Sequence, residues 1–173
     1  IQVEESFQNL IDNGSFEGGK YSSNNVGSNQ GNTIIKKVNP GKSSFILRQT
    51  AKIGDSIKRT RYQMTAQVLP SISYRISLWC SHTKDWDGNY NIFNITFHKD
   101  CGDDEILIKE GSIIKRKNMD KNVWELRELI FDTPSNSNGK IDVYVGYDPN
   151  NHKGFRFITD ITLERYYPLI KKM

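Results

Sequence analysis

Aromatic rings on the polar phase of alternating strands are the side chains in this sequence best suited to bind a ligand. Trp79 falls in phase with Arg75 and Ser77 rather than with the apolar side chains around it, and Tyr144 likewise falls in phase with Asp142. Rings flanked by amides, carboxylates and guanidiniums have the composition of a sugar-binding groove. If their strands share one sheet, the residues that line a common face are Arg75, Trp79, Asn94, Thr96, Asp142 and Tyr144. The alternative is that a loop covers Trp79 and Tyr144, because large aromatic side chains are more often buried than displayed.

A polar loop at residues 82–90 holds a second candidate site. Trp86 and Tyr90 lie there among charged and amide side chains, and no apolar pattern draws them into a core. Exposed aromatic residues on loops are typical of binding tips, so the sequence favours contact of both rings with a ligand. Tyr147 and His152, from a later loop, can join either site. The alternative is that Trp86 folds back and plugs the edge of a sheet.

The elements that must position these residues are short strands. Apolar and polar side chains alternate in short runs that clusters of Gly, Asn, Asp, Ser and Pro separate, and no helical period of useful length occurs. Predicted strands cover residues 33–38, 45–50, 61–68, 74–80, 93–98, 105–109, 112–117, 124–131, 141–145 and 155–163. The apolar phase shifts between Leu126 and Leu129, which predicts a bulge there. Strands without helices predict an all-β fold, a two-sheet antiparallel β-sandwich of the jelly-roll type, with the first and last strands paired.

Length and composition limit the possible classes of protein. The 173 residues fit a single domain over residues 1–173, with a tail from about residue 166 that frays or leads into a neighbouring domain. No apolar run approaches the roughly 20 residues of a membrane span. The net charge of +4 comes from scattered basic residues without a nucleic-acid-binding motif, so a lysine-rich surface is favoured over a dedicated anionic partner. Cys80 and Cys101 either form one bridge or are both reduced thiols.

Catalytic motifs are missing from the sequence. The carboxylates of residues 85–87 and 103–105 lie in turn-like segments, where solvated side chains are the commoner explanation. The three histidines form no zinc-binding pattern, and neither a nucleophile elbow nor a phosphate-binding glycine loop occurs. We therefore expect no enzymatic activity.

Several segments, in order along the chain, resemble the jelly-roll carbohydrate-binding modules of the galactose-binding-like type. Residues 9–17, NLIDNGSFE, resemble that family's N-L-hydrophobic-x-N-G-x-F-E start, and residues 73–79, SYRISLW, resemble its centre. The strand that begins at Trp124 and residues 157–163, FITDITL, resemble its later strands. The resemblance implies the jelly-roll fold, binding of glycans without catalysis, and a packing role for Trp124.

The same resemblance implies a structural calcium ion between the opening loop and the last strand. The matching carboxylates are Glu17 and Asp160, and backbone carbonyls of residues 39–42 are further possible ligands. Calcium binds six to eight oxygen atoms, so such a mixture of ligands suits it. Thr159 stands where the family has the first of two aspartates, which reduces the coordination. The alternative is that both carboxylates bind loop backbone and no metal.

The sequence thus predicts a non-catalytic, lectin-like, glycan-binding module that is extracellular, on a cell surface or associated with a virion. Its partners are a glycan and other domains or subunits of a larger protein, without nucleic acid and without membrane insertion. The predicted ligand-binding residues are Arg75, Trp79, Trp86, Tyr90, Asn94, Asp142 and Tyr144. The alternative is a structural or interaction domain of a viral appendage, toxin or surface protein that binds no sugar.

Overall fold

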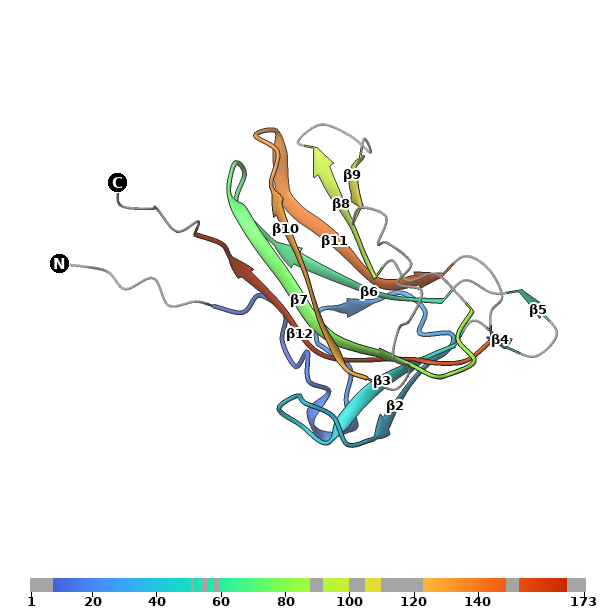
Figure 1. The fold of residues 1–173 in the computed structure, drawn as a ribbon. Coiled ribbons are helices and arrows are strands. Elements are labelled where there is room, and N and C mark those ends of the chain that lie inside the picture. Colours follow the sequence, from blue (N-terminus) through green and yellow to red (C-terminus); the bar gives the residue numbers. More distant parts are fainter. Residues whose placement is uncertain are drawn as a thin grey trace, which may run out of the picture.

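Two five-stranded antiparallel sheets pack face to face in the computed structural model (Figure 1). The structure describes residues 8–50, 52–53, 56–57, 60–87, 92–99, 105–109, 123–148 and 153–167. Sheet A has the order β1-β6-β11-β8-β9 and consists of β1 (Asn25–Val26), β6 (Thr60–Gln67), β11 (Ser137–Asp148), β8 (Phe93–Lys99) and β9 (Glu105–Lys109). Sheet B has the order β10-β7-β12-β3-β2 and consists of β10 (Glu125–Asp132), β7 (Ser73–His82), β12 (Arg156–Arg165), β3 (Phe45–Gln49) and β2 (Asn32–Lys36).

The remaining described elements are small. A separate hairpin joins β4 (Lys52–Ile53) to β5 (Ser56–Ile57), and a 3-10 turn, η1, covers Glu17–Gly19. Among the described residues, no helix has the length and apolar character that a membrane span requires. The predicted all-β sandwich of two antiparallel sheets is therefore confirmed.

The core lies between the two sheets and follows from the alternation of the strands. Tyr62 and Met64 of β6 and Ile76 and Leu78 of β7 are completely buried, whereas the polar residues between them turn outward. A residue in a strand faces the side opposite to its neighbours, so alternate apolar residues build one inner face on each sheet. Each fully buried Leu or Ile side chain contributes about 1.5–3 kcal/mol relative to its exposed state.

Strand β10 shows why the bulge prediction is wrong. It pairs with β7 without a shift of register, from Glu125 opposite Cys80 to Asp132 opposite Ser73. The apolar phase changes because Leu126 and Ile130 point outward, with 52% and 47% of their surface exposed. The three described register shifts lie instead in β12, between Thr159 and Thr162, and near both ends of β11, between Ser137 and Ile141 and between Val145 and Asp148.

The predicted pairing of the first and last strands is also wrong, although the opening segment does lie beside β12 (Figure 1). Strand β2, which corresponds to the first predicted strand, pairs with β3; β1 pairs with β6, and β12 pairs with β7 and β3. The residues before η1 dock on β12 without forming a regular strand: the Leu10 amide donates to the Leu163 carbonyl (2.8 Å), and the Ile161 amide donates to the Gly14 carbonyl (3.1 Å). The predicted strand at 112–117 and residue Cys101 lie outside the described residues.

Candidate ligand-binding surfaces

The six residues expected on one face are divided between two sheets. Arg75 and Trp79 belong to β7 in sheet B, whereas the other four belong to β8 and β11 in sheet A. Because the outer faces of a sandwich point in opposite directions, the prediction of one common face is wrong. Strands with the same alternation are indistinguishable in sequence even when they end in different sheets.

The outer face of sheet A does bring together the candidates from β8 and β11. Tyr144 lies opposite both Gln63 of β6 and Asn94 of β8. In the neighbouring row, Asp142 lies opposite Thr65 and Thr96. Residues directly opposite each other in adjacent strands share a face. We call this the sheet A surface, and its members are Arg61, Gln63, Thr65, Asn94, Thr96, Lys140, Asp142 and Tyr144.

Exposure divides the sheet A surface into accessible and covered parts. Tyr144, Asn94 and Gln63 are half-buried, whereas Asp142 is only 7% exposed. The guanidinium carbon of Arg61 lies 5.2 Å from the centre of the Tyr144 ring, which is cation–π geometry. The sequence contains a signal for Arg61 and Gln63, because both occupy the polar phase of their strand, but it does not show that this strand lies beside those of Asn94 and Tyr144.

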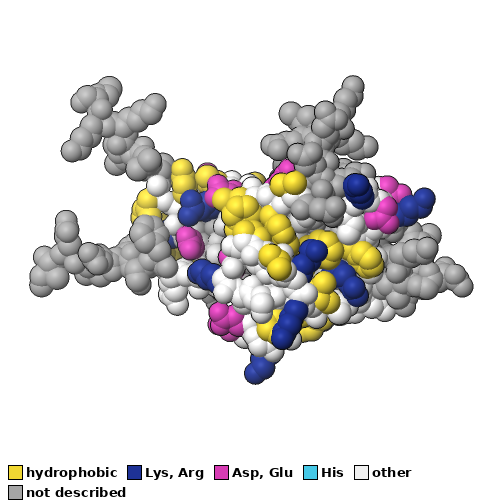
Figure 2. Space-filling model, turned by 60° about the horizontal axis from the view of Figure 1, so that its bottom comes forward, with side chains coloured by type: hydrophobic (Ala, Val, Ile, Leu, Met, Phe, Trp, Pro, Cys, Tyr) yellow, Lys and Arg dark blue, Asp and Glu magenta, His cyan; other side chains and the backbone are white. Residues whose placement is uncertain are grey.

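The outer face of sheet B carries the other two candidates. Arg75 forms an ion pair with Glu164 of β12, with 3.4 Å between Nη2 and Oε2. Half-buried Trp79 lies opposite the exposed Leu126, one strand away. Figure 2 views the molecule from this side and shows hydrophobic side chains gathered among lysines and arginines. We call the set Arg75, Trp79, Leu126, Ile130, Phe157 and Glu164 the sheet B surface.

Trp124 packs against this same side of the molecule. Its ring centre is 6.4 Å from that of Phe157, and it is not a member of the buried core cluster. The packing role implied by the family resemblance is therefore present, on the outside of sheet B rather than in the core.

Trp86 is buried, so the expectation of an exposed binding tip is wrong and the alternative of a ring that folds back is confirmed. Only 3% of its surface is exposed. The guanidinium of the fully buried Arg156 lies 4.5 Å from the ring centre, and the ring of His82 lies 4.8 Å away. The buried guanidinium of Arg156 thus contacts the Trp86 ring and donates a hydrogen bond to His82. The sequence of the loop around Trp86 does not reveal this partner. Tyr90 and His152 lie outside the described residues.

Arg156 belongs to a row of buried polar residues that sequence reasoning missed. Asn32, Gln49, Arg156 and His82 are consecutive cross-strand neighbours in β2, β3, β12 and β7. The Arg156 Nε donates to the His82 Nε2 over 3.1 Å. A row of this kind depends on strand order, which no local pattern encodes.

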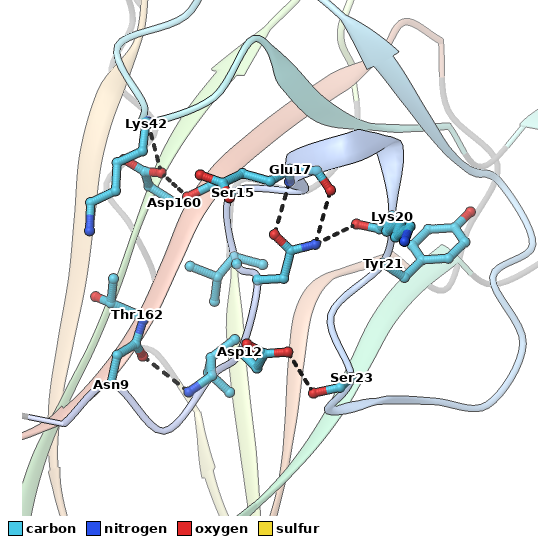
Figure 3. Close-up of a pocket in the computed structure, with 14 residues that line it drawn as sticks. Asn9, Asp12, Ser15, Glu17, Lys20, Tyr21, Ser23, Lys42, Asp160 and Thr162 are labelled. Carbon is cyan, nitrogen blue, oxygen red and sulfur yellow. Dashed lines mark hydrogen bonds between the residues drawn. The ribbon is translucent and has the colours of Figure 1, made fainter.

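The opening loop surrounds a cavity of about 640 Å³ beside β12 (Figure 3). The Asn13 side chain holds the loop in shape: its Nδ2 donates to the carbonyls of Glu17 (3.3 Å) and Lys20 (3.1 Å), and its Oδ1 accepts from the Glu17 amide (2.9 Å). Both Asn13 and Phe16 adopt left-handed backbone angles, which bend the chain into this compact turn.

Asp160 connects the cavity to the last strand. Its backbone has φ of 53°, at the register shift of β12, and its Oδ1 accepts hydrogen bonds from the Ser15 hydroxyl (2.6 Å) and the Lys42 amide (3.2 Å). Glu17 and Asp160 line the same cavity, together with the side chains of Lys20 and Lys42. Among the described residues no three His, Cys, Asp or Glu side chains cluster in a way that could hold a metal. A cation here would thus depend on two carboxylates and on carbonyl oxygens.

Comparison with known proteins identifies the fold. No protein-family model matches the chain, and a search of curated proteins found no match. Among solved structures, a family 16 carbohydrate-binding module superposes with a TM-score of 0.59 at 14% identity, over 90% of this chain and 99% of the module. The family 61 module TmCBM61, solved in complex with β-1,4-galactotriose, superposes with a TM-score of 0.52 at 18% identity, over 92% of this chain and 99% of the module. The resemblance to jelly-roll carbohydrate-binding modules is therefore confirmed for the fold.

The same fold also occurs as part of longer chains. The enzymatically active domain of tailspike protein 4 from bacteriophage CBA120 superposes with a TM-score of 0.65 at 15% identity, over 91% of this chain. The match covers only 21% of that tailspike chain. The present chain thus corresponds in length to a whole module and to about a fifth of the tailspike structure.

Proposed function

We propose that the chain is a carbohydrate-binding module and that its glycan lies on the sheet A surface, against the ring of Tyr144. The observation that carries this proposal is a half-buried aromatic ring on an outward, polar face, flanked in register by the amides of Gln63 and Asn94. The C–H faces of a sugar ring pack on an aromatic ring, while amides donate to and accept from its hydroxyls. An apolar platform with a few placed polar groups is the usual composition of a ligand site.

The same surface supports binding rather than hydrolysis. Glycoside hydrolysis requires two carboxyl groups that flank the scissile bond, about 5–10 Å apart. Among the eight residues named above as the sheet A surface, Asp142 is the one carboxylate, and it is almost completely buried. We therefore propose a non-catalytic role for this chain.

A glycan screen tests the proposal. The whole chain and its Tyr144→Ala variant are screened on an array of plant, bacterial and animal glycans, and positive glycans are titrated by calorimetry. We expect Tyr144→Ala to weaken binding at least about ten-fold, because stacking of a nucleic-acid base on one aromatic ring contributes on the order of 1–3 kcal/mol and a sugar would use the same kind of platform. Tyr167→Ala is the matched control, because Tyr167 is also partly exposed beneath a guanidinium, that of Arg165, but lies at the end of β12. Equal affinities of the two variants would place the glycan elsewhere.

We also propose that calcium binds in the cavity beside the opening loop, with Glu17 and Asp160 as its carboxylate ligands. The support is that both carboxylates line one cavity and that only one oxygen of Asp160 accepts hydrogen bonds within the described residues. Lys20 and Lys42 line the same cavity and repel a cation. We therefore expect weak binding, in the range of about 0.1–1 mM that extracellular calcium modules show.

A second function, that of an assembly domain in a larger extracellular or virion protein, is favoured by the sheet B surface. Leu126 and Ile130 are about half exposed beside Trp79, and apolar patches of this kind often mark contacts between proteins. This function would be favoured over the first if the chain bound no glycan on the array but associated with itself or with a neighbouring domain. Leu126→Ser and Ile130→Ser should then abolish that association.

A further inference from the structure

We propose that the glycan is acidic and that the guanidinium of Arg61 binds its carboxylate groups. This inference rests on the proposed function of the sheet A surface and names the class of glycan that the surface selects. A planar guanidinium matches a carboxylate with two parallel N–H···O bonds, so Arg61 is the group on this surface that would distinguish uronic acids from neutral sugars.

The first argument is the position of Arg61. It stands two residues before Gln63 on the outward phase of β6, and its guanidinium lies over the ring of Tyr144, the residue of the proposed stacking site. The ring lies 5.2 Å from the guanidinium carbon and restricts the side chain. A side chain that is already ordered loses less conformational entropy when a ligand binds.

The second argument is that the donors of Arg61 have no carboxylate partner in the described structure. On the opposite sheet, Arg75 does have such a partner, because it forms an ion pair with Glu164. Arg75 is thus paired with a carboxylate of its own chain, whereas the described partner of the Arg61 guanidinium is the ring of Tyr144. A guanidinium carries five N–H donors, and no described hydrogen bond uses one from the Arg61 side chain.

The third argument is the sign of the accessible charge. Asp142 is buried and lies opposite Thr65 of β6. Thr65 is four residues from Arg61, so the backbone positions of Arg61 and Thr65 are about 13 Å apart along the strand. Lys140, at the far end of the surface, is exposed. Arg61 and Lys140 thus stand at the two ends of the Tyr144 platform, in a chain with a net charge of +4.

The experiment compares acidic and neutral polysaccharides on the same protein. Polygalacturonate, glucuronoxylan and alginate form the acidic panel, and galactan and unsubstituted xylan form the neutral panel. Each is titrated into the wild-type chain and into Arg61→Gln at low and high salt. We expect tighter binding to at least one acidic member, and Arg61→Gln weakens that binding about ten-fold or more while changing neutral affinities by less than about two-fold.

The control separates a specific site from general attraction of a basic protein. Arg48→Gln removes the same charge from another arginine that lies over a ring, because the Arg48 guanidinium is 4.8 Å from the Phe155 ring on sheet B. The inference is overturned if Arg48→Gln weakens acidic binding as much as Arg61→Gln, or if dextran sulfate displaces the uronate polymer equally well. It is also overturned if the chain binds neutral glycans through Tyr144 and ignores acidic ones, a result that leaves the proposed function intact. Absence of binding to every glycan, by a protein with an unchanged melting curve, overturns both.

Discussion

Tyr62 shows at the residue scale how the core holds the opening loop. Its side chain is fully buried, its hydroxyl accepts the Ser22 amide over 2.9 Å, and its ring meets that of Phe16 edge to face at 5.7 Å. Burial raises the pKa of Tyr62 far above its ordinary value of about 10, because a phenolate in the core loses its solvation. The Ser22 amide opposes this rise and Tyr21 adds a little to it.

The raised pKa predicts a loss of stability in alkali. The folded state resists ionisation of Tyr62 while the unfolded chain ionises near pH 10, so the contribution is complete below about pH 10 and is lost as the pH rises further. Urea unfolding from about pH 8 to about pH 11 should show a decline of up to roughly 1.4 kcal/mol per pH unit above 10. Tyr62→Phe should be about 1 kcal/mol less stable at neutral pH, since the Ser22 amide loses its acceptor, but should decline less steeply. Parallel curves for the two proteins would show that other groups cause the loss.

At the scale of elements, the contact between the opening segment and β12 requires a glycine. A Cβ atom at position 14 would overlap the carbonyl oxygen of Ile161. We expect Gly14→Ala to reduce the free energy of unfolding by about 2 kcal/mol, because the segment must move away from the strand and loses its hydrogen bonds. Urea denaturation measures the change.

Gly18→Asn provides the matched control for that substitution. Gly18 also lies in the opening loop and has φ of 69°, but nothing approaches the position of its Cβ within 4 Å. Asparagine tolerates this left-handed backbone, so we expect a change of less than about 0.5 kcal/mol. A similar loss in both variants would mean that the loop tolerates no substitution and that contact with Ile161 is not the cause.

The calcium proposal belongs to the same element. Added calcium should raise the melting temperature with half-saturation near about 1 mM, and a chelator should reverse the rise. Glu17→Gln should abolish the response, whereas Glu128→Gln, on exposed β10, should retain it. Identical melting curves in calcium and in chelator would show that the hydrogen bonds of Asn13 and Asp160 close the loop without a metal.

The strands easiest to predict from the sequence are those in which apolar and polar residues clearly alternate. Strands β6, β7, β8 and β11 alternate over at least part of their length, and each lies at or near its predicted position. Strand β1 and the β4–β5 hairpin have two residues per strand, too few to display a period. The docking of residues 10–14 on β12 depends on backbone groups and on a glycine, so it leaves no apolar pattern either.

The whole molecule explains why the candidate site was only partly predictable. Alternation tells which side chains of one strand face outward, and Asn94, Asp142 and Tyr144 do share an outer face. Alternation does not tell which strands are neighbours. The sequence therefore predicts one face for Trp79 and Tyr144, although their strands belong to different sheets. Trp86 shows the same limit, because its burial depends on Arg156, which is distant in sequence.

The separation of the two surfaces predicts independent effects. We expect Trp79→Ala to change glycan affinity by less than about two-fold, because two sheets about 10 Å apart stand between Trp79 and the proposed site. The combination of Trp79→Ala with Tyr144→Ala should bind as weakly as Tyr144→Ala alone in the same calorimetric titration. Loss of binding in a correctly folded Trp79→Ala protein, judged by circular dichroism, would move the glycan to sheet B.

The opening segment also determines how the domain responds to tension. From Leu10 to Gly14 the chain runs antiparallel to β12, so both ends of the described chain leave the sandwich at the same side. A force that pulls these ends apart therefore breaks the hydrogen bonds one after another. The bond between Leu10 and Leu163 breaks first, the bond between Gly14 and Ile161 breaks next, and the segment then separates from β12. The domain should therefore unfold gradually from its opening loop when it is stretched, while the strand pairs of sheet A beneath the proposed site bear no load until that loop has detached.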